Sequence, residues 1–127
     1  MILLPWPPTV NKYWRHAGAK VLLSEQGRAY KKVVRLRVLA AGVRPIREGA
    51  VSLRVRFYPK DNRRRDLDNL LKALLDALSP GVYTDDAQVK EIHAVMMKPR
   101  KDLKRPVNWR ATLLITCRKS VGNQGWV

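Results

Sequence analysis

Residues 51–78 read VSLRVRFYPKDNRRRDLDNLLKALLDAL and carry two hydrophobic periods in succession. Apolar and polar side chains alternate over 51–58, which predicts a strand with one buried face. Leucines then recur at helical spacing, which predicts a helix over 67–78 that stops at Pro80-Gly81. The apolar face of this helix is predicted to consist of Leu67, Leu71, Leu74 and Leu78, with Leu70 and Leu75 on its edges.

Another helix is predicted upstream, beginning after Ser24. Ser24 suits the N-cap position, and Glu25 suits the positive end of the helix dipole. Gly42 and Pro45 end this helix. Its apolar stripe is predicted to comprise Ala29, Val33, Leu36 and Ala40, widened by Tyr30, Val34 and Ala41.

The other strands are predicted over 2–4, 89–97 and 109–116 from their apolar patterning. The resulting order, β-α-β-α-β-β, predicts an α+β fold in which two helices pack on a mixed sheet. A length of 127 residues suits one domain, so we expect a single domain over 1–127. The tail over 119–127 has no pattern of its own and is expected to be flexible.

Charge is the unusual feature of the composition. The chain has 26 Lys and Arg against 10 Asp and Glu, a formal net charge of +16. Such a field attracts polyanions, so nucleic acid is the expected partner. A membrane surface would call for a basic amphipathic helix or a polybasic tail, whereas these basic residues are spread through the chain.

Other compositional features predict a cytoplasmic protein. Cys117 is the only cysteine, which rules out an internal disulfide and favours a buried small residue over a reactive thiol. The first residues run directly into a proline-rich segment, unlike a signal peptide. No apolar run approaches the ~20 residues of a membrane span. We therefore expect a soluble, intracellular protein with no membrane association.

Residues 9–23 are predicted to form an ordered or semi-ordered basic arm. Its cations Lys12, Arg15 and Lys20 are candidate DNA-binding residues. Aromatic residues are interleaved with them, among them Tyr13 and Trp14. These rings would either stack on opened bases or pack beneath the arm, and packing is the commoner use of an aromatic side chain.

Acidic residues are concentrated in one region of this basic chain. Six of the ten lie between Asp61 and Asp86. Carboxylates beside a phosphate-binding surface weaken binding unless a cation neutralises them, and Mg²⁺ does so while bridging to phosphate. Asp66 and Asp68 are two apart and point to one side on an extended segment. Lys72 follows Asp68 by four positions and shares its helix face. A strand that returns beside residues 51–58 would bring Asp86 close to them.

The same residues have plainer interpretations. Asp68 could cap a helix start, and Asp85-Asp86 could form a solvated turn. Lys72 could be a surface lysine in an i,i+4 pair. The run of Arg63, Arg64 and Arg65 could be solvated, although its place directly before Asp66 favours phosphate binding.

Three blocks give the chain a family resemblance. They are LPWPP at 4–8 with Asn11, RRRDLDNLLK at 63–72 and DDAQV at 85–89. In this order and at this spacing they resemble the RusA family of Holliday junction resolvases. The resemblance implies a homodimeric endonuclease that depends on Mg²⁺, with Mn²⁺ as a possible substitute, and cuts four-way DNA junctions. It also implies a bacterial or phage origin.

The resemblance assigns roles to individual residues. The family's essential aspartates fall on Asp66, Asp68 and Asp86, which would bind the metal, and its essential lysine falls on Lys72. Asp85 is a possible metal ligand or a neighbour of one. Lys72 would stabilise the pentacovalent phosphate or position the attacking water. His93 lies in a strand pattern and is expected to be structural.

Two functional classes follow. One is a metal-dependent, structure-selective nuclease; the other is a non-catalytic nucleic-acid-binding or architectural protein. The second accounts for the charge of +16 but not for the acidic cluster. Cleavage of a four-way junction only in the presence of Mg²⁺ would separate them.

Overall fold

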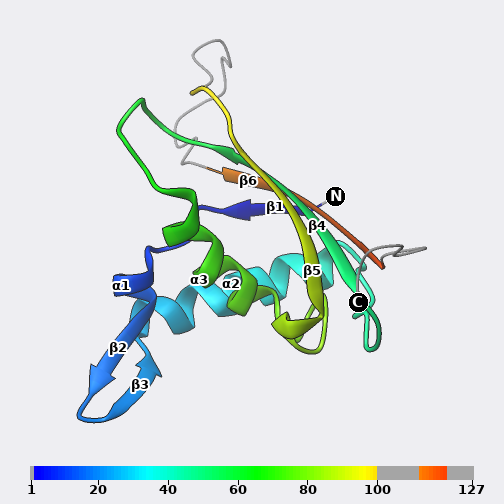
Figure 1. Ribbon diagram of the computed structural model, residues 1–127, viewed down its shortest axis with the longest axis horizontal. Helices are drawn as coiled ribbons and strands as arrows, with labels where there is room; N and C mark the ends of the chain where they lie inside the picture. Colours follow the sequence, from blue (N-terminus) through cyan, green and yellow to red (C-terminus); the bar gives the residue numbers. More distant parts are fainter. Residues whose placement is uncertain (1, 100–111, 120–127) are drawn as a thin grey trace.

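The computed structural model describes residues 2–99 and 112–119, which form a small α+β domain (Figure 1). In chain order its elements are β1 (Ile2–Pro5), α1 (Val10–Tyr13), β2 (Trp14–Ala17), β3 (Lys20–Leu23), α2 (Glu25–Ala40), β4 (Val51–Tyr58), α3 (Leu67–Leu78), the 3₁₀ turn η1 (Asp86–Gln88), β5 (Val89–Met96) and β6 (Thr112–Lys119). The predicted class and the predicted major helices are confirmed. Residues 109–111 of the predicted last strand and the tail from 120 lie outside the described residues.

The main sheet is mixed, as predicted, with the strand order β1-β6-β4-β5. β4 pairs parallel to β5 and antiparallel to β6, and β6 pairs antiparallel to β1. The parallel pair needs a crossover, which α3 supplies between β4 and β5. This connection places the loop after β4 and the start of α3 at one end of the sheet (Figure 1).

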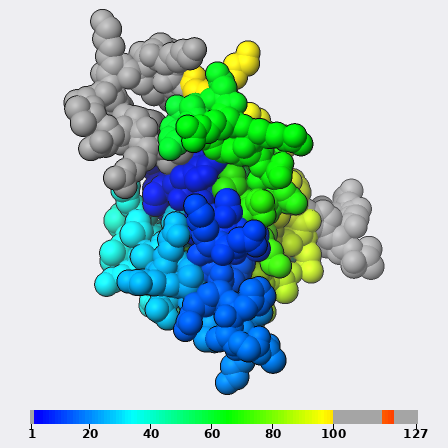
Figure 2. Space-filling view, turned by 90° about the vertical axis from the view of Figure 1, so that its left-hand side faces the viewer, coloured from blue at the N-terminus to red at the C-terminus, as the bar shows by residue number. Residues whose placement is uncertain are grey.

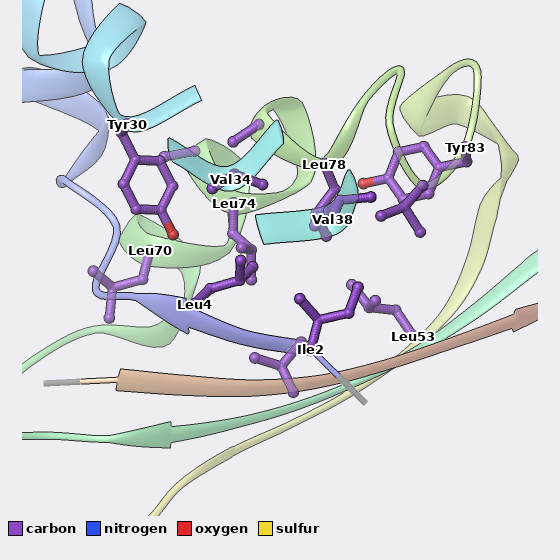
Figure 3. Packing of buried hydrophobic residues seen from close by; sticks show 14 of the residues in the cluster. Ile2, Leu4, Tyr30, Val34, Val38, Leu53, Leu70, Leu74, Leu78 and Tyr83 are labelled. Carbon is purple, nitrogen blue, oxygen red and sulfur yellow. The ribbon is translucent and has the colours of Figure 1, made fainter. Parts of the chain in front are cut away.

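The predicted buried face of β4 is confirmed. Val51, Leu53, Val55 and Phe57 are at most 1% exposed, and Arg54 and Arg56 are exposed on the opposite side. Figure 3 shows the helix residues Val34, Val38, Leu74 and Leu78 facing the sheet residues Ile2, Leu4 and Leu53. The core is therefore a single layer between the two long helices and one face of the sheet.

The buried face of α3 differs from the predicted one. Its buried residues are Leu70, Ala73, Leu74, Ala77 and Leu78, whereas Leu67 and Leu71 are only half-buried. The spacing of the leucines alone does not determine which face of α3 is buried, because Ala73 and Ala77 also belong to that face. The two alanines face the interior, where small side chains let a neighbouring element approach closely, and this turns the buried face away from Leu67 and Leu71.

The predicted centre of the apolar stripe of α2 is wrong, although Tyr30 and Val34, two of the residues predicted to widen it, are buried. The helix buries Gly27, Tyr30, Val34 and Val38, and it leaves Ala29, Val33, Leu36 and Ala40 exposed. Both sets have helical spacing, so periodicity alone could not choose between them. Tyr30 helps fix the choice, because its buried ring brings the hydroxyl to the Pro5 carbonyl at 2.8 Å.

Residues 9–23, predicted to be an ordered or semi-ordered arm, have regular secondary structure over most of their length. They form the short helix α1 and the β2–β3 hairpin, paired from Trp14↔Leu23 to Ala17↔Lys20 around Gly18, whose φ is +63°. A positive φ suits glycine in so tight a turn. Among the described residues, no helix is both long and apolar enough to cross a membrane.

Candidate active site

Two of the predicted metal ligands lie at the start of α3. Asp66 occupies the N-cap position, but its side chain makes no capping hydrogen bond. Asp68 lies in the first turn, where its Oδ1 accepts a hydrogen bond from the Asn69 amide at 3.0 Å. Both side chains are exposed. Carboxylates are favoured at this end of a helix because the unpaired amides carry partial positive charge.

Lys72 lies one turn further along α3 and is exposed, as is Asp68. Its ammonium is 5.7 Å from the centroid of the Trp14 ring. That distance is within the range of a cation–π interaction. Asp68 and Lys72 are thus both exposed on α3, four positions apart as predicted. Asp66 is the N-cap and Asp68 is already helical, so the two aspartates do not lie on the extended segment that was predicted.

The three arginines before Asp66 are not equivalent. Arg65 is the least exposed: it donates to Asp61 Oδ1 at 2.6 Å and to the carbonyls of Asp61 and Arg63 at 3.0 and 2.9 Å. Its guanidinium also lies 5.6 Å from the Trp6 ring centroid. The hydrogen bond from Arg65, with one from the Arg63 amide, holds the pKa of Asp61 below its usual value. Arg65 thus braces the loop, while Arg63 and Arg64 face solvent.

Asp85 and Asp86 have different environments. Asp85 caps η1: its Oδ1 accepts from the Ala87 amide at 2.9 Å, and the Gln88 side chain accepts from the Asp85 amide at 2.9 Å. Partial burial and then the neighbouring Asp85 and Asp76 raise the pKa of Asp86. Asp85 therefore has a structural role in the turn, whereas desolvation and the two nearby carboxylates disfavour the charged form of Asp86.

Asp86 lies at the start of η1, on a different element from Asp66 and Asp68. The Asp76 carboxylate on α3 is near enough to contribute to the raised pKa of Asp86. Over the described part of the chain, no three His, Cys, Asp or Glu side chains are grouped to hold a metal ion. The role of Asp86 as a ligand stays a prediction.

The residue types nevertheless suit a hard divalent cation. Mg²⁺ binds through one or two carboxylates, keeps several waters and takes its remaining ligands from phosphate. The exposed pair Asp66 and Asp68 satisfies that requirement. Since no hydrogen bond or ion pair within the described residues occupies Asp66, its carboxylate is available.

Sequence reasoning missed one contact beside this site. The Tyr13 side chain is fully buried, and its hydroxyl donates to Asp76 Oδ2 at 2.5 Å. Lys31 Nζ lies 3.5 Å from the same oxygen. Burial and then the Asp76 carboxylate raise the pKa of Tyr13. Tyr13 therefore packs, as the commoner use of an aromatic predicted. The only signal for its partner was that Asp76 continues the polar stripe of Asp68 and Lys72.

The cations of the predicted arm lie on the exposed part of the same region. Lys12, Arg15 and Lys20 are exposed on α1 and the hairpin. In Figure 2 the blue segment with α1 lies between α2 (cyan) and α3 (green), and the β2–β3 hairpin projects below them. Their use in DNA binding remains a prediction that this placement allows.

Comparison with known proteins gives the chain a family. The family model described as endodeoxyribonuclease RusA matches residues 5–108. The chain belongs to the RusA family. It is 39% identical over 105 residues to the crossover junction endodeoxyribonuclease RusA of Escherichia coli (strain K12), covering 79% of this chain and 84% of that protein. Identity is 41% over 102 residues to the protein of the same name from Enterobacteria phage 82, with the same coverage.

A relative of the same name from Enterobacteria phage HK97 is 36% identical over 94 residues, covering 73% of this chain and 78% of the relative. The family predicted from the three sequence blocks is thus confirmed, and with it a DNA-cleaving hydrolase. The matched region takes in the start of α3 and η1, which carry all of the predicted catalytic residues.

Proposed function

We propose that this chain is a Mg²⁺-dependent crossover junction endodeoxyribonuclease that resolves Holliday junctions in DNA recombination and repair. The observation that carries the proposal is the exposed group of Asp66, Asp68 and Lys72 on α3, in a chain of the RusA family with a net charge of +16. Because the named relatives come from bacteria and phages, we place the reaction in the bacterial cytoplasm.

Asp66 and Asp68 would hold the ion, with Asp86 as a further predicted ligand. Mn²⁺ would replace Mg²⁺, since both accept oxygen ligands. A bound divalent ion lowers the pKa of a water and neutralises charge on the phosphate. Desolvation and then the nearby Asp85 and Asp76 raise the pKa of Asp86, and a bound cation would favour its charged form.

Lys72 would act on the phosphate itself. As a compact cation one turn after Asp68, it can stabilise the extra negative charge of the pentacovalent phosphate or position the attacking water. Arg63, Arg64, Lys12, Arg15 and Lys20 would bind the flanking backbone phosphates. Arg65 would contribute mainly by shaping the loop, because Asp61 and Trp6 already engage its guanidinium.

The active species would be a homodimer. Resolution requires two cuts in opposing strands, and one such chain carries one group of Asp66, Asp68 and Lys72. A two-fold dimer would present two sites in the symmetry of the junction. An exposed apolar stripe on α2 supports self-association, because burying it against a second copy would remove apolar surface from water. The stripe consists of Ala29, Val33, Leu36 and Ala40.

Incubation with a synthetic four-way junction, with and without Mg²⁺, tests the proposal. We expect two symmetrically placed nicks only in the presence of Mg²⁺, and no cutting of a linear duplex containing the same sequences. Binding without cleavage under all divalent cations would instead support the non-catalytic, architectural alternative.

A further inference from the structure

Among the described residues, the side chain of Lys72 makes one specific contact, with the indole ring of Trp14. Its ammonium lies 5.7 Å from the ring centroid, and no hydrogen bond or ion pair joins it to another described residue. A free lysine side chain samples many rotamers and loses conformational entropy when one of them is fixed. A cation–π contact at an exposed site offsets part of that loss and biases the side chain toward the ring.

Trp14 is in turn held firmly. Its ring packs edge-on against Tyr13, with 4.4 Å between centroids and 74° between the planes. The Tyr13 carbonyl accepts hydrogen bonds from the Ser24 amide at 2.9 Å and the Ser24 hydroxyl at 3.0 Å. The Tyr13 hydroxyl donates to Asp76 on α3. The indole is therefore fixed to α2 through the backbone and to α3 through Tyr13.

We propose that Trp14 is a positioning residue for Lys72. The β2–β3 hairpin begins at Trp14, and it supplies an aromatic face over which the Lys72 ammonium lies, one helical turn after Asp68. This limits the conformations that Lys72 samples before substrate binds. The inference rests on the proposed function for its catalytic consequence, but the contact itself can be measured without any cleavage.

Trp6 provides the matched comparison. Its ring centroid lies 5.6 Å from the Arg65 guanidinium, so the described residues contain a second tryptophan–cation pair, whose cation directly precedes Asp66 in sequence. Arg65 has three further hydrogen bonds that keep it in place, whereas Lys72 has none among the described residues. Loss of the ring should therefore release Lys72 but not Arg65.

The first experiment measures the contact directly by NMR. An ammonium above an indole places the ε-methylene protons of Lys72 in the shielding region of the ring, so their signal, assigned with Lys72→Ala, should lie upfield of the other lysines. Trp14→Leu should return it to the ordinary position, and Trp6→Leu should not. An unshifted Lys72 signal in the unmodified protein would overturn the proposal, whatever the protein does to DNA.

The second experiment measures the consequence for cleavage as a single-turnover double-mutant cycle. We expect Trp14→Leu to slow junction cleavage by about 5-fold to 100-fold, and Trp14→Phe, which keeps an aromatic face, to recover most of the rate. In the Lys72→Ala background Trp14→Leu should cost less than about two-fold. The loss caused by Trp6→Leu should instead be undiminished in that background.

The outcomes separate the two claims. An equal loss from Trp14→Leu with and without Lys72, or no recovery by Trp14→Phe in a variant that melts normally, would reduce Trp14 to a structural residue. Absence of Mg²⁺-dependent cleavage by the unmodified protein would refute the proposed function, and the NMR shift would still decide whether Trp14 holds Lys72.

Discussion

Gly27 shows how one residue allows the N-terminal segment to reach the site. A Cβ at this position would come closer than 3.0 Å to the Tyr13 carbonyl oxygen, a distance that real Cβ atoms essentially never show. That carbonyl accepts two hydrogen bonds from Ser24 and fixes the backbone next to Trp14. The space left by glycine is therefore needed for α1 to lie against the first turn of α2.

Gly27→Ala should destabilise the fold. Overpacking against a backbone atom costs about 2–3 kcal/mol, the upper part of the usual range, and the better helix propensity of alanine offsets about 1 kcal/mol of it. We expect a net fall of about 3–8 °C in Tm by calorimetry. Gly81→Ala is the control, because a Cβ there meets its nearest atom at an ordinary 3.5 Å. Equal Tm values for the two variants would contradict the close contact.

Lys72 allows a prediction that distinguishes chemistry from binding. If it acts on the transition state, Lys72→Ala should lower the single-turnover rate of junction cleavage and leave junction affinity within a few fold. A mere phosphate contact would give the opposite pattern: weaker affinity, a salt slope smaller by about one unit and unchanged chemistry. That second pattern would return Lys72 to the DNA-binding surface.

At the scale of elements, the sequence predicted those helices and strands whose apolar and polar residues follow a clear period. The alternation of β4 and the start and end of α3 are confirmed, because one buried face imposes each pattern. The N-cap Ser24 is confirmed by its 2.9 Å hydrogen bond from the Gly27 amide. The family blocks contain Asp66, Asp68 and Lys72, which are exposed at the N-cap and on the first turns of α3.

What could not be predicted depends on tertiary contacts. α2 has two apolar stripes of equal period, and only contacts such as that of Tyr30 with Pro5 select the buried one. The β2–β3 hairpin has no alternating apolar face to reveal it, since most of its residues are exposed. The position of Asp86 depends on how the segment before η1 returns along α3, where the Tyr83 hydroxyl donates to the Leu75 carbonyl at 2.6 Å.

The exposed stripe of α2 leads to a prediction about assembly. Leu36 is 58% exposed at the centre of this stripe. Each leucine buried contributes about 1.5–3 kcal/mol, and a two-fold interface contains it twice. Leu36→Glu should therefore weaken self-association by more than about ten-fold, measured by analytical ultracentrifugation. Ala41→Glu, an equal charge change at the end of α2, should not. Unchanged dimerisation in Leu36→Glu would move the interface elsewhere.

At the scale of the whole molecule, the charge of +16 has opposite effects on the two associations. Junction binding releases counterions and should weaken as salt is raised. Self-association brings like charges together and should strengthen as salt screens them. The two equilibria can therefore be separated by ionic strength.

The dimer makes a prediction about the order of cuts. Unmodified protein mixed with an excess of Asp68→Asn and allowed to exchange subunits would form heterodimers with one active site. On a supercoiled cruciform these should make one cut, so nicked circles should accumulate in place of linear product. A proportional fall in linear product without nicked circles would indicate that the subunits act independently.

The central claim is that carboxylates at the start of α3 bind a metal that cuts DNA, and Asp68→Asn tests it most directly. Cleavage and binding of one four-way junction should be measured side by side in Mg²⁺. We predict that cleavage falls by about 100-fold or more, while binding persists or tightens because a negative charge facing the phosphates is lost. Cleavage by Asp68→Asn at a rate close to that of the unmodified protein would contradict the account.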